Sequence, residues 1–387
     1  FAENAKCSFR CDQGFLLSGF EYGNNFLECS MSKNGVNLTW NGDSKHITLM
    51  SVNGPESTII DAQGWNDGVD SQPSRRVFVF DNSGQNSNDI IDGFTIRNGY
   101  LDGSNGFEHG GGIYIHNSSP TFTNCIIRDN KIYRYCNNCE TRGGGIHLYN
   151  SNSTFTNCQI LNNEARADVN SPYEYYAHAR GGGVYVDEGN PSLINSLIKD
   201  NLVFSKDHDT DDDSRAYGYG AGVYKWGGGT LTLTDVEISS NGFSSEGQEI
   251  SHYGGGIYAY DGTTNINNCT IVYNNKQGVY RTNSATVNVN SSVIWYNNND
   301  DEGAVNYQYT NRQGSPPGGE GNISLDPWFV DYQNEDYSLS PGSVCINRGN
   351  STWADPDGTR RDMGKYIYTD TNQGPTWYVA PNGSFEN

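Results

Sequence analysis

The chain has 387 residues, with 24 Lys and Arg against 45 Asp and Glu, which gives a formal net charge of −21. Such an acidic chain lacks the basic surface that nucleic acids and anionic membranes require, so we expect neither partner. No stretch approaches the roughly 20 apolar residues of a membrane-spanning helix, so we expect no membrane insertion. The 47 glycines and 26 tyrosines exclude a helical bundle and favour many short strands joined by tight turns.

The first 44 residues place Cys7, Cys11 and Cys29 near Trp40, a spacing that partly resembles a complement-control (sushi) module. The four cysteines of such a module are not all present. The simpler prediction is an N-terminal cap over residues 1–44, pinned by disulfides among these cysteines. A sheet that starts here needs a cap because its first strand otherwise presents an open edge.

Residues 45–368 repeat two motifs. The first is a glycine triplet followed by Ile or Val and then Tyr or His; it starts at Gly110 and returns at Gly143, Gly181, Gly220 and Gly254. The second runs from Phe122 to Asn130, and successive copies lie 22 to 40 residues apart. A spacing of 22 residues suits one coil of three short strands, and the longer spacings are that coil plus an insertion. This pattern predicts an all-β parallel β-helix.

The second motif predicts a bend within each coil. Phe122 and Asn124 share one strand parity, whereas Cys125 and Ile127 share the other, so the strand must bend at Asn124. Asparagine tolerates the left-handed backbone that such a bend needs. Coils stacked about 4.8 Å apart would align these side chains into an amide ladder. The bend position is occupied in later copies by Asn157, Asn195, Asp235, Asn268 and Asn290, and the end position by Asn130, Asn163, Asn201, Asn241, Asn275 and Asn297.

Cys125, Cys158 and Cys269 occupy one position of the repeat. We predict small buried thiols there. A disulfide between Cys125 and Cys158 on adjacent coils is the alternative that remains open.

These motifs resemble the right-handed parallel β-helix (pectate-lyase-like) superfamily. The glycine triplets and the Ile-x-x-Asn turns are similar to polymorphic outer-membrane-protein-like bacterial surface proteins. The segment from Asp336 to Gly364 resembles the part that closes such domains. The resemblance implies a single-stranded right-handed parallel β-helix with lateral loop insertions. It implies no single function, because this fold carries lyases, hydrolases and adhesins.

Four insertions, 131–142, 164–180, 202–219 and 242–253, leave the coil at the same corner. We expect them to be loops that stack into one lateral wall rich in Tyr and His. Loops gathered on one side of a rigid repeat are usually its binding surface.

The residue before each glycine triplet forms a predicted column beside this wall: His109, Arg142, Arg180, Tyr219 and Tyr253. Arginine beside a Tyr or His base is what a uronate lyase needs, because the cation neutralises the sugar carboxylate and the base removes the α-proton. The other interpretation is that the two arginines only pair with loop carboxylates.

A second column follows the glycine triplets and is expected to point outward: Tyr114, His147, Tyr185, Tyr224, Tyr258 and Tyr280, widened by Trp226 and Tyr260. An exposed aromatic strip suits glycan rings or a protein partner. The alternative is that the rings only stack across strands or lie under the adjacent loops.

Two short motifs suggest metal or disulfide chemistry. Asp207, Asp209, Asp211 and Asp213 could bind calcium, although a solvated acidic loop is the favoured interpretation. Cys136 and Cys139 are expected to form a small loop disulfide if the protein is exported.

Asn-x-Ser/Thr triplets and few lysines favour an extracellular or cell-surface protein, with candidate glycosylation sites at Asn37, Asn117, Asn152, Asn322, Asn350 and Asn382. Residues 369–387 are interpreted as a linker and the start of a following module. We therefore expect a non-catalytic structural or adhesive segment of a surface or filament protein that contacts glycans or proteins and associates end to end. It requires no cofactor, with calcium an optional one. The alternative function is a polysaccharide lyase or glycosidase.

Overall fold

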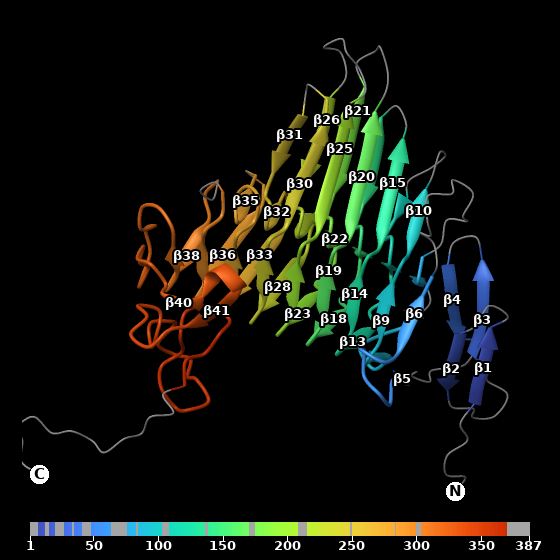
Figure 1. Ribbon diagram of the computed structural model, residues 1–387, viewed down its shortest axis with the longest axis horizontal. Coiled ribbons are helices and arrows are strands. Elements are labelled where there is room, and N and C mark those ends of the chain that lie inside the picture. The colour runs from blue at the N-terminus through green and yellow to red at the C-terminus, as the bar shows by residue number, and fades with distance from the viewer. Residues whose placement is uncertain are drawn as a thin grey trace, which may run out of the picture.

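The computed structural model describes residues 48–369, apart from 63–75, 83, 103–107, 136–137, 170–174, 208–214, 248–249, 283 and 299–302, and four strands within the first 47 residues. From Thr48 onward the described chain winds into a right-handed parallel β-helix, which confirms the predicted fold (Figure 1). The four strands before it pair as two antiparallel hairpins. Right-handed crossovers are the rule between parallel strands of one sheet. Within this described part, no helix has the length and hydropathy required to span a bilayer.

Three nine-stranded sheets, B1, B2 and B3, form the body, and a complete coil adds one strand to each. Sheet B1 contains β3 (Leu27–Ser32), β4 (Gly35–Trp40), β7 (Phe78–Asp81), β12 (Ile113–His116), β17 (Ile146–Tyr149), β22 (Val184–Asp187), β27 (Val223–Trp226), β32 (Ile257–Ala259) and β35 (Val279–Arg281). Sheet B2 contains β5 (Thr48–Met50), β8 (Ile90–Asp92), β13 (Thr121–Thr123), β18 (Thr154–Thr156), β23 (Ser192–Ile194), β28 (Thr230–Thr234), β33 (Thr263–Asn267), β36 (Thr286–Asn290) and β38 (Asn306–Gln308). Sheet B3 contains β6 (Ile59–Asp61), β9 (Thr95–Arg97), β14 (Ile126–Arg128), β19 (Gln159–Leu161), β24 (Leu197–Lys199), β29 (Glu237–Ser239), β34 (Thr270–Val272), β37 (Val293–Trp295) and β39 (Asn311–Arg312).

Apolar side chains fill the body in vertical columns. Ile113 pairs in register with Ile146 on the next coil, and both are fully buried. Phe122 stacks on Phe155, with ring centroids 4.9 Å apart and planes 5° apart. Cys125 and its counterparts at the same repeat position are buried free thiols, so the prediction of thiols is confirmed and the disulfide alternative is wrong.

The predicted bend and its amide ladder are confirmed, except that the left-handed residue after β36 is Ser291 and not the predicted Asn290. Asn124, Asn157 and Asn195 have φ values of 51°, 54° and 45°, in the left-handed region. The Nδ2 atom of Asn157 donates to Oδ1 of Asn124 at 3.2 Å, and Nδ2 of Asn195 donates to Oδ1 of Asn157 at 2.8 Å. This ladder lies on the outside of the body.

A second amide ladder is buried. Nδ2 of Asn130 donates to Oδ1 of Asn163 at 2.9 Å, and the series continues through Asn201 and Asn241. The next member is Asn274, which corrects the prediction of Asn275. In that coil Tyr273 takes the left-handed position after β34, so the following residue is the one that turns inward.

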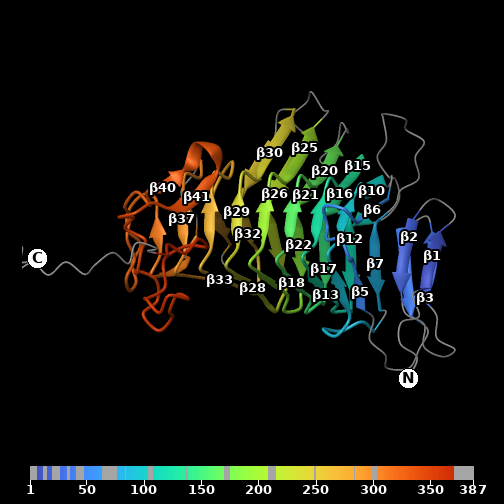
Figure 2. The same cartoon turned by 60° about the horizontal axis from the view of Figure 1, so that its bottom comes forward.

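The four insertions form strands, so the prediction of lateral loops is wrong. Each insertion supplies one strand to each of two five-stranded parallel sheets, A1 and A2, and the fifth strand of each comes from the preceding coil, where the sequence predicted no insertion. The two sheets project from the body as an arm (Figures 1 and 2). Sheet A1 contains β10 (Tyr100–Asp102), β15 (Lys131–Tyr135), β20 (Glu164–Val169), β25 (Leu202–Asp207) and β30 (Gly242–Glu246). Sheet A2 contains β11 (Glu108–His109), β16 (Cys139–Arg142), β21 (Tyr176–Arg180), β26 (Arg215–Tyr219) and β31 (Ile250–Tyr253).

Small side chains explain why the insertions pair as sheets. Ala165 and Ala167 on β20 alternate with Arg166, and Ala177 and Ala179 on β21 alternate with polar residues. These alanines are fully buried within a second apolar cluster, because A1 and A2 pack face to face. Alternation of period two is the pattern of a half-buried strand.

Short elements lie at both ends of the described chain. Strands β1 (Cys7–Cys11) and β2 (Phe15–Gly19) pair antiparallel, as do β40 (Phe329–Asp331) and β41 (Asp336–Leu339), which flank the 3-10 helix η1 (Tyr332–Asn334). The C-terminal segment folds back along the outer face of B3, where Nζ of Lys365 donates to the Ser196 carbonyl at 2.8 Å. It therefore covers a side of the helix rather than only closing its end.

Candidate functional site

The two predicted columns lie on either side of the junction between arm sheet A2 and body sheet B1, which is called the inner corner. The glycine triplets make the turn between these sheets. Gly110 has a φ of 66°, and a Cβ atom there would lie 2.4 Å from the Ile113 carbonyl oxygen, so no larger residue fits. Strand register aligns each column along the helix axis, as predicted.

The column on B1 is buried except at its two ends, where Tyr114 and Tyr280 are partly exposed, so the prediction of an exposed aromatic strip is wrong. Tyr185, Tyr224 and His147 have relative exposures of 0%, 1% and 2%. The A2 column lies against them: the rings of His109 and His147 are 4.6 Å apart. The alternative interpretation is therefore the correct one: the adjacent insertions cover these rings.

Within this column each ring covers the face of the next. The ring centroids of Tyr185 and Tyr224 are 5.0 Å apart, and those of Tyr224 and Tyr258 are 5.2 Å apart with planes at 5°. The stack continues to Tyr280 at 5.0 Å. Rings stacked in this way leave only their edges for a ligand, which disfavours packing of a sugar ring on their faces.

The two arginines of the A2 column are paired. Glu140 accepts hydrogen bonds from Arg142 Nε at 2.8 Å and Nη2 at 3.1 Å, and it also accepts one from Arg180. Arg142 Nη1 lies 3.4 Å from Oδ2 of Asp187. This arrangement confirms the interpretation that the arginines pair with carboxylates.

Aromatic rings hold the arginines from the other side. The Cζ atom of Arg180 lies 5.6 Å from the ring centroid of Tyr224 and 5.5 Å from that of Trp226. Burial opposes the charged form of Arg142, but the hydrogen bond to Glu140 and the charges of Glu140 and Asp187 together outweigh it and raise the arginine pKa. Arg142 and Arg180 therefore stay charged and connect the arm to the body.

The pKa values of the predicted bases do not suit proton abstraction near neutral pH. Burial, together with the charge of Arg142, lowers the pKa of His109 to about 3. Burial raises the pKa of Tyr219 well above its ordinary value, so its hydroxyl stays protonated. A general base works best with a pKa near the operating pH.

Exposed aromatic residues remain at the outer margins of the inner corner. Trp226 and Tyr260 stack with centroids 4.3 Å apart and planes at 13°, and Tyr260 is exposed. On the arm, Tyr176 is exposed, and its centroid lies 6.2 Å from that of Tyr217.

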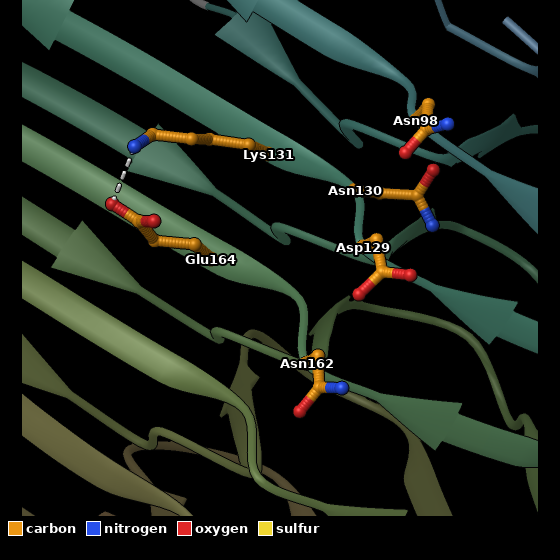
Figure 3. Close-up of a pocket in the computed structure, with 6 residues that line it drawn as sticks. All are labelled: Asn98, Asp129, Asn130, Lys131, Asn162 and Glu164. Atoms are coloured by element: carbon orange, nitrogen blue, oxygen red, sulfur yellow. Dashed lines mark ion pairs between the residues drawn. The ribbon is translucent and has the colours of Figure 1, made fainter. Parts of the chain in front are cut away.

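A second corner, the outer corner, lies on the opposite side of the arm, between sheets B3 and A1. It holds a pocket of about 300 Å³ that the sequence did not reveal, lined by Asn98, Asp129, Asn130, Lys131, Asn162 and Glu164. In Figure 3, Asn98, Asp129 and Asn162 lie one below another at the bend, and Lys131 pairs with Glu164 to one side. The distance from Lys131 Nζ to Glu164 Oε1 is 2.9 Å.

The predicted calcium ligands are only partly described. Asp207 is buried at the end of β25, whereas Asp209, Asp211 and Asp213 lie outside the described residues. Elsewhere in the described chain, no group of three or more His, Cys, Asp or Glu side chains is placed to hold a metal ion.

Cys139 is disulfide-bonded, and its predicted partner Cys136 lies outside the described residues. The side chains of Cys7, Cys11 and Cys29 also lie outside them. Among the candidate glycosylation sites, Asn117 and Asn152 are exposed, Asn322 and Asn350 are partly exposed, and the side chains of Asn37 and Asn382 are not described.

No protein-family model matches the chain, and no curated protein is similar to it. Among solved structures, the crystal structure of pectate lyase Pel9A is similar, with 13% sequence identity, 87% of each chain covered and a TM-score of 0.35. A likeness at this level concerns the path of the chain alone.

Proposed function

We propose that this chain is a non-catalytic structural and adhesive segment of an extracellular surface or filament protein. The proposal depends on how the two arginines of the A2 column, which resembles a lyase site, are bonded. Arg142 and Arg180 share Glu140 and stack on aromatic rings, so their charges are committed to holding the arm on the body. A cation used in this way is a poor partner for a substrate carboxylate, because binding substrate would break a buried ion pair.

Continuous bonding along the axis supports a load-bearing role. Each body sheet runs through nine strands, and the two amide ladders join coil to coil beside them. A repeat of this kind gains length without a new fold. End-to-end association would follow if the edge strands of terminal coils, such as β38 and β39, pair with another copy.

The proposed contact surface is the exposed margin of the inner corner. Trp226, Tyr260, Tyr176 and Tyr217 present ring edges and polar tips there. Such groups suit a protein surface or a glycan that approaches from the side. No cofactor is needed for this role, and calcium remains an optional ligand of the 207–213 segment.

An activity assay separates this proposal from the lyase alternative. The protein is incubated with a panel of uronic-acid polymers, and unsaturated product is followed by its ultraviolet absorbance. We expect no product from the wild-type protein. Product that the substitution Arg180→Ala abolishes would overturn the structural proposal.

A binding assay tests the contact surface. Trp226→Ala and Tyr260→Ala are expected to reduce attachment of the protein to immobilised matrix glycans and proteins. Tyr135→Ala is the matched control, since Tyr135 is an exposed aromatic residue on the arm sheet A1, away from the inner corner. Equal loss in all three variants would refute a specific role for this margin.

A further inference from the structure

The outer corner contains a column of residues with left-handed backbone. One residue per coil, directly after the B3 strand, has a φ between 53° and 56°. The members are Asn98, Asp129, Asn162, Asp200, Ser240, Tyr273 and Tyr296. At a rung spacing of about 4.8 Å, seven coils span roughly 30 Å along the axis.

The residue types in this column change along the axis. The first five members are Asn, Asp or Ser, and Asn and Asp accept positive φ readily. The last two are Tyr273 and Tyr296, each with φ of 55°. A bulky residue in this conformation costs about 1–2 kcal/mol, and such strain clusters at sites that clamp ligands.

The two tyrosines form an aromatic platform with Tyr332 of η1. The centroids of Tyr273 and Tyr296 are 4.9 Å apart, and those of Tyr296 and Tyr332 are 5.1 Å apart. Tyr332 is 40% exposed. Tyr273 and Tyr296 are partly buried and pack on the apolar cluster of the C-terminal segment, which accounts for two rings of the platform and leaves the exposed Tyr332 unexplained.

The opposite end of the column is the polar pocket of Figure 3. Asn98, Asp129 and Asn162 supply amide and carboxylate groups that both accept and donate hydrogen bonds. These groups suit a ligand rich in hydroxyls, and the paired Lys131 and Glu164 complete one side of the pocket. In Figure 1 the corner runs from β9 and β10 past β19 and β20 toward the C-terminal segment.

The charges of the outer corner favour a neutral ligand. Asp61 accepts from Arg97 Nε at 2.8 Å, and Arg128 Nη1 lies 2.6 Å from Oδ2 of Asp129. Further along, Lys199 pairs with Glu335 of the C-terminal segment. Cations and carboxylates are thus matched, and a chain with a net charge of −21 repels anionic ligands.

We propose that the outer corner binds a neutral oligosaccharide that lies along the helix axis. Its hydroxyls bond to the amides and carboxylates of the pocket end, and the apolar face of a sugar ring packs on Tyr332, the exposed member of the platform. A few convergent polar groups beside aromatic rings are the usual composition of such a site. This site is independent of the proposed function, because it lies on the other side of the arm from the inner corner.

The test is a calorimetric titration with cello-, xylo-, manno- and chito-oligosaccharides of increasing length, with polygalacturonate as the anionic comparison. We expect at least one neutral series to bind, with affinity that rises with length. Tyr332→Asn should weaken binding about tenfold, the loss of roughly one ring contact. Tyr296→Asn removes the ring that supports Tyr332 and should also weaken binding. Asparagine already occupies the Tyr296 position in other coils, so this backbone accepts it.

Two further variants sharpen the test. Asn162→Gly keeps a residue that accepts positive φ while removing the pocket amide, so it should weaken long oligosaccharides and leave short ones unaffected. Tyr260→Asn at the inner corner is the matched control and should bind as the wild type does. Thermal unfolding of each variant separates lost binding from lost folding. If Tyr296→Asn does not fold, the result for Tyr332→Asn decides, because Tyr332 is exposed and its replacement leaves the core intact.

Three results would overturn the proposal. They are no binding in any neutral series, binding of polygalacturonate alone, and wild-type affinity in folded Tyr296→Asn and Tyr332→Asn variants.

Discussion

Asn201 allows the energetic role of the buried amide ladder to be measured. Its Nδ2 donates to the Ile160 carbonyl and to Oδ1 of Asn241, both at 2.9 Å, and the residue is 1% exposed. Asn201→Asp keeps the size and shape of the side chain but removes both donors. A buried acceptor left without a donor costs about 1–3 kcal/mol, which applies to the Ile160 carbonyl. Oδ1 of Asn241 keeps the hydrogen bond from the Asn201 backbone N–H at 3.0 Å, so its loss is smaller. Burial of the new carboxylate adds to this loss.

Asn195→Asp is the matched control in the external ladder. Asn195 is exposed, and the next coil already has Asp235 at the same left-handed position. Its single lost bond, 2.8 Å to Asn157, faces water, so we expect a change within about 1 kcal/mol. Urea unfolding followed by far-ultraviolet circular dichroism gives both midpoints. Equal midpoints for the two variants would refute the claim that burial makes the internal ladder the stronger one.

Other consequences concern the arm and the thiols. Glu140→Ala leaves Arg142 and Arg180 without their shared carboxylate, so it should lower the free energy of unfolding by about 3 kcal/mol. Hydrogen exchange in the arm strands should become faster, and unchanged exchange would contradict the role of these ion pairs. Burial lowers the pKa of His109 to about 3 and of His178 and His252 to about 4, from 6.5. The unfolded chain therefore binds more protons than the folded one near and below pH 6.5. The urea midpoint of unfolding should decrease as the pH is lowered from 7.5 to 5, and a constant midpoint would count against the burial of these histidines. A thiol reagent should label none of the four buried free cysteines in the native protein and all of them in denaturant: Cys125, Cys158, Cys269 and Cys345.

Local features of the body could be predicted because they repeat. The parity change at Asn124 and the glycine turn at Gly110 each require a backbone conformation that few residues adopt. Such requirements are visible in a single copy and are reinforced by each further copy. The prediction of Asn275 for Asn274 was wrong because Tyr273 occupies the left-handed position that Asn, Asp or Ser holds in earlier coils.

The arm was harder to predict because its signal is weak. Ala165 and Ala167 alternate with polar residues, but alanine contributes little apolar contrast, and the insertions vary in length. Pairing of β20 with β25 depends on neighbours distant in the sequence. Once that pairing places A2 against B1, an outward-pointing column such as that of Tyr185 becomes buried.

The sequence by itself determined the coil, its bends, its internal columns and its buried thiols, because each depends on short-range backbone preference and on side-chain parity that every copy repeats. Only the tertiary structure decided which outward-pointing residues meet solvent. That outcome depends on how the arm packs on the body. Because of this packing most of the predicted aromatic strip is buried, and Arg142 and Arg180 form ion pairs with Glu140. It also placed a polar pocket and a tyrosine platform along a corner where the sequence had indicated neither.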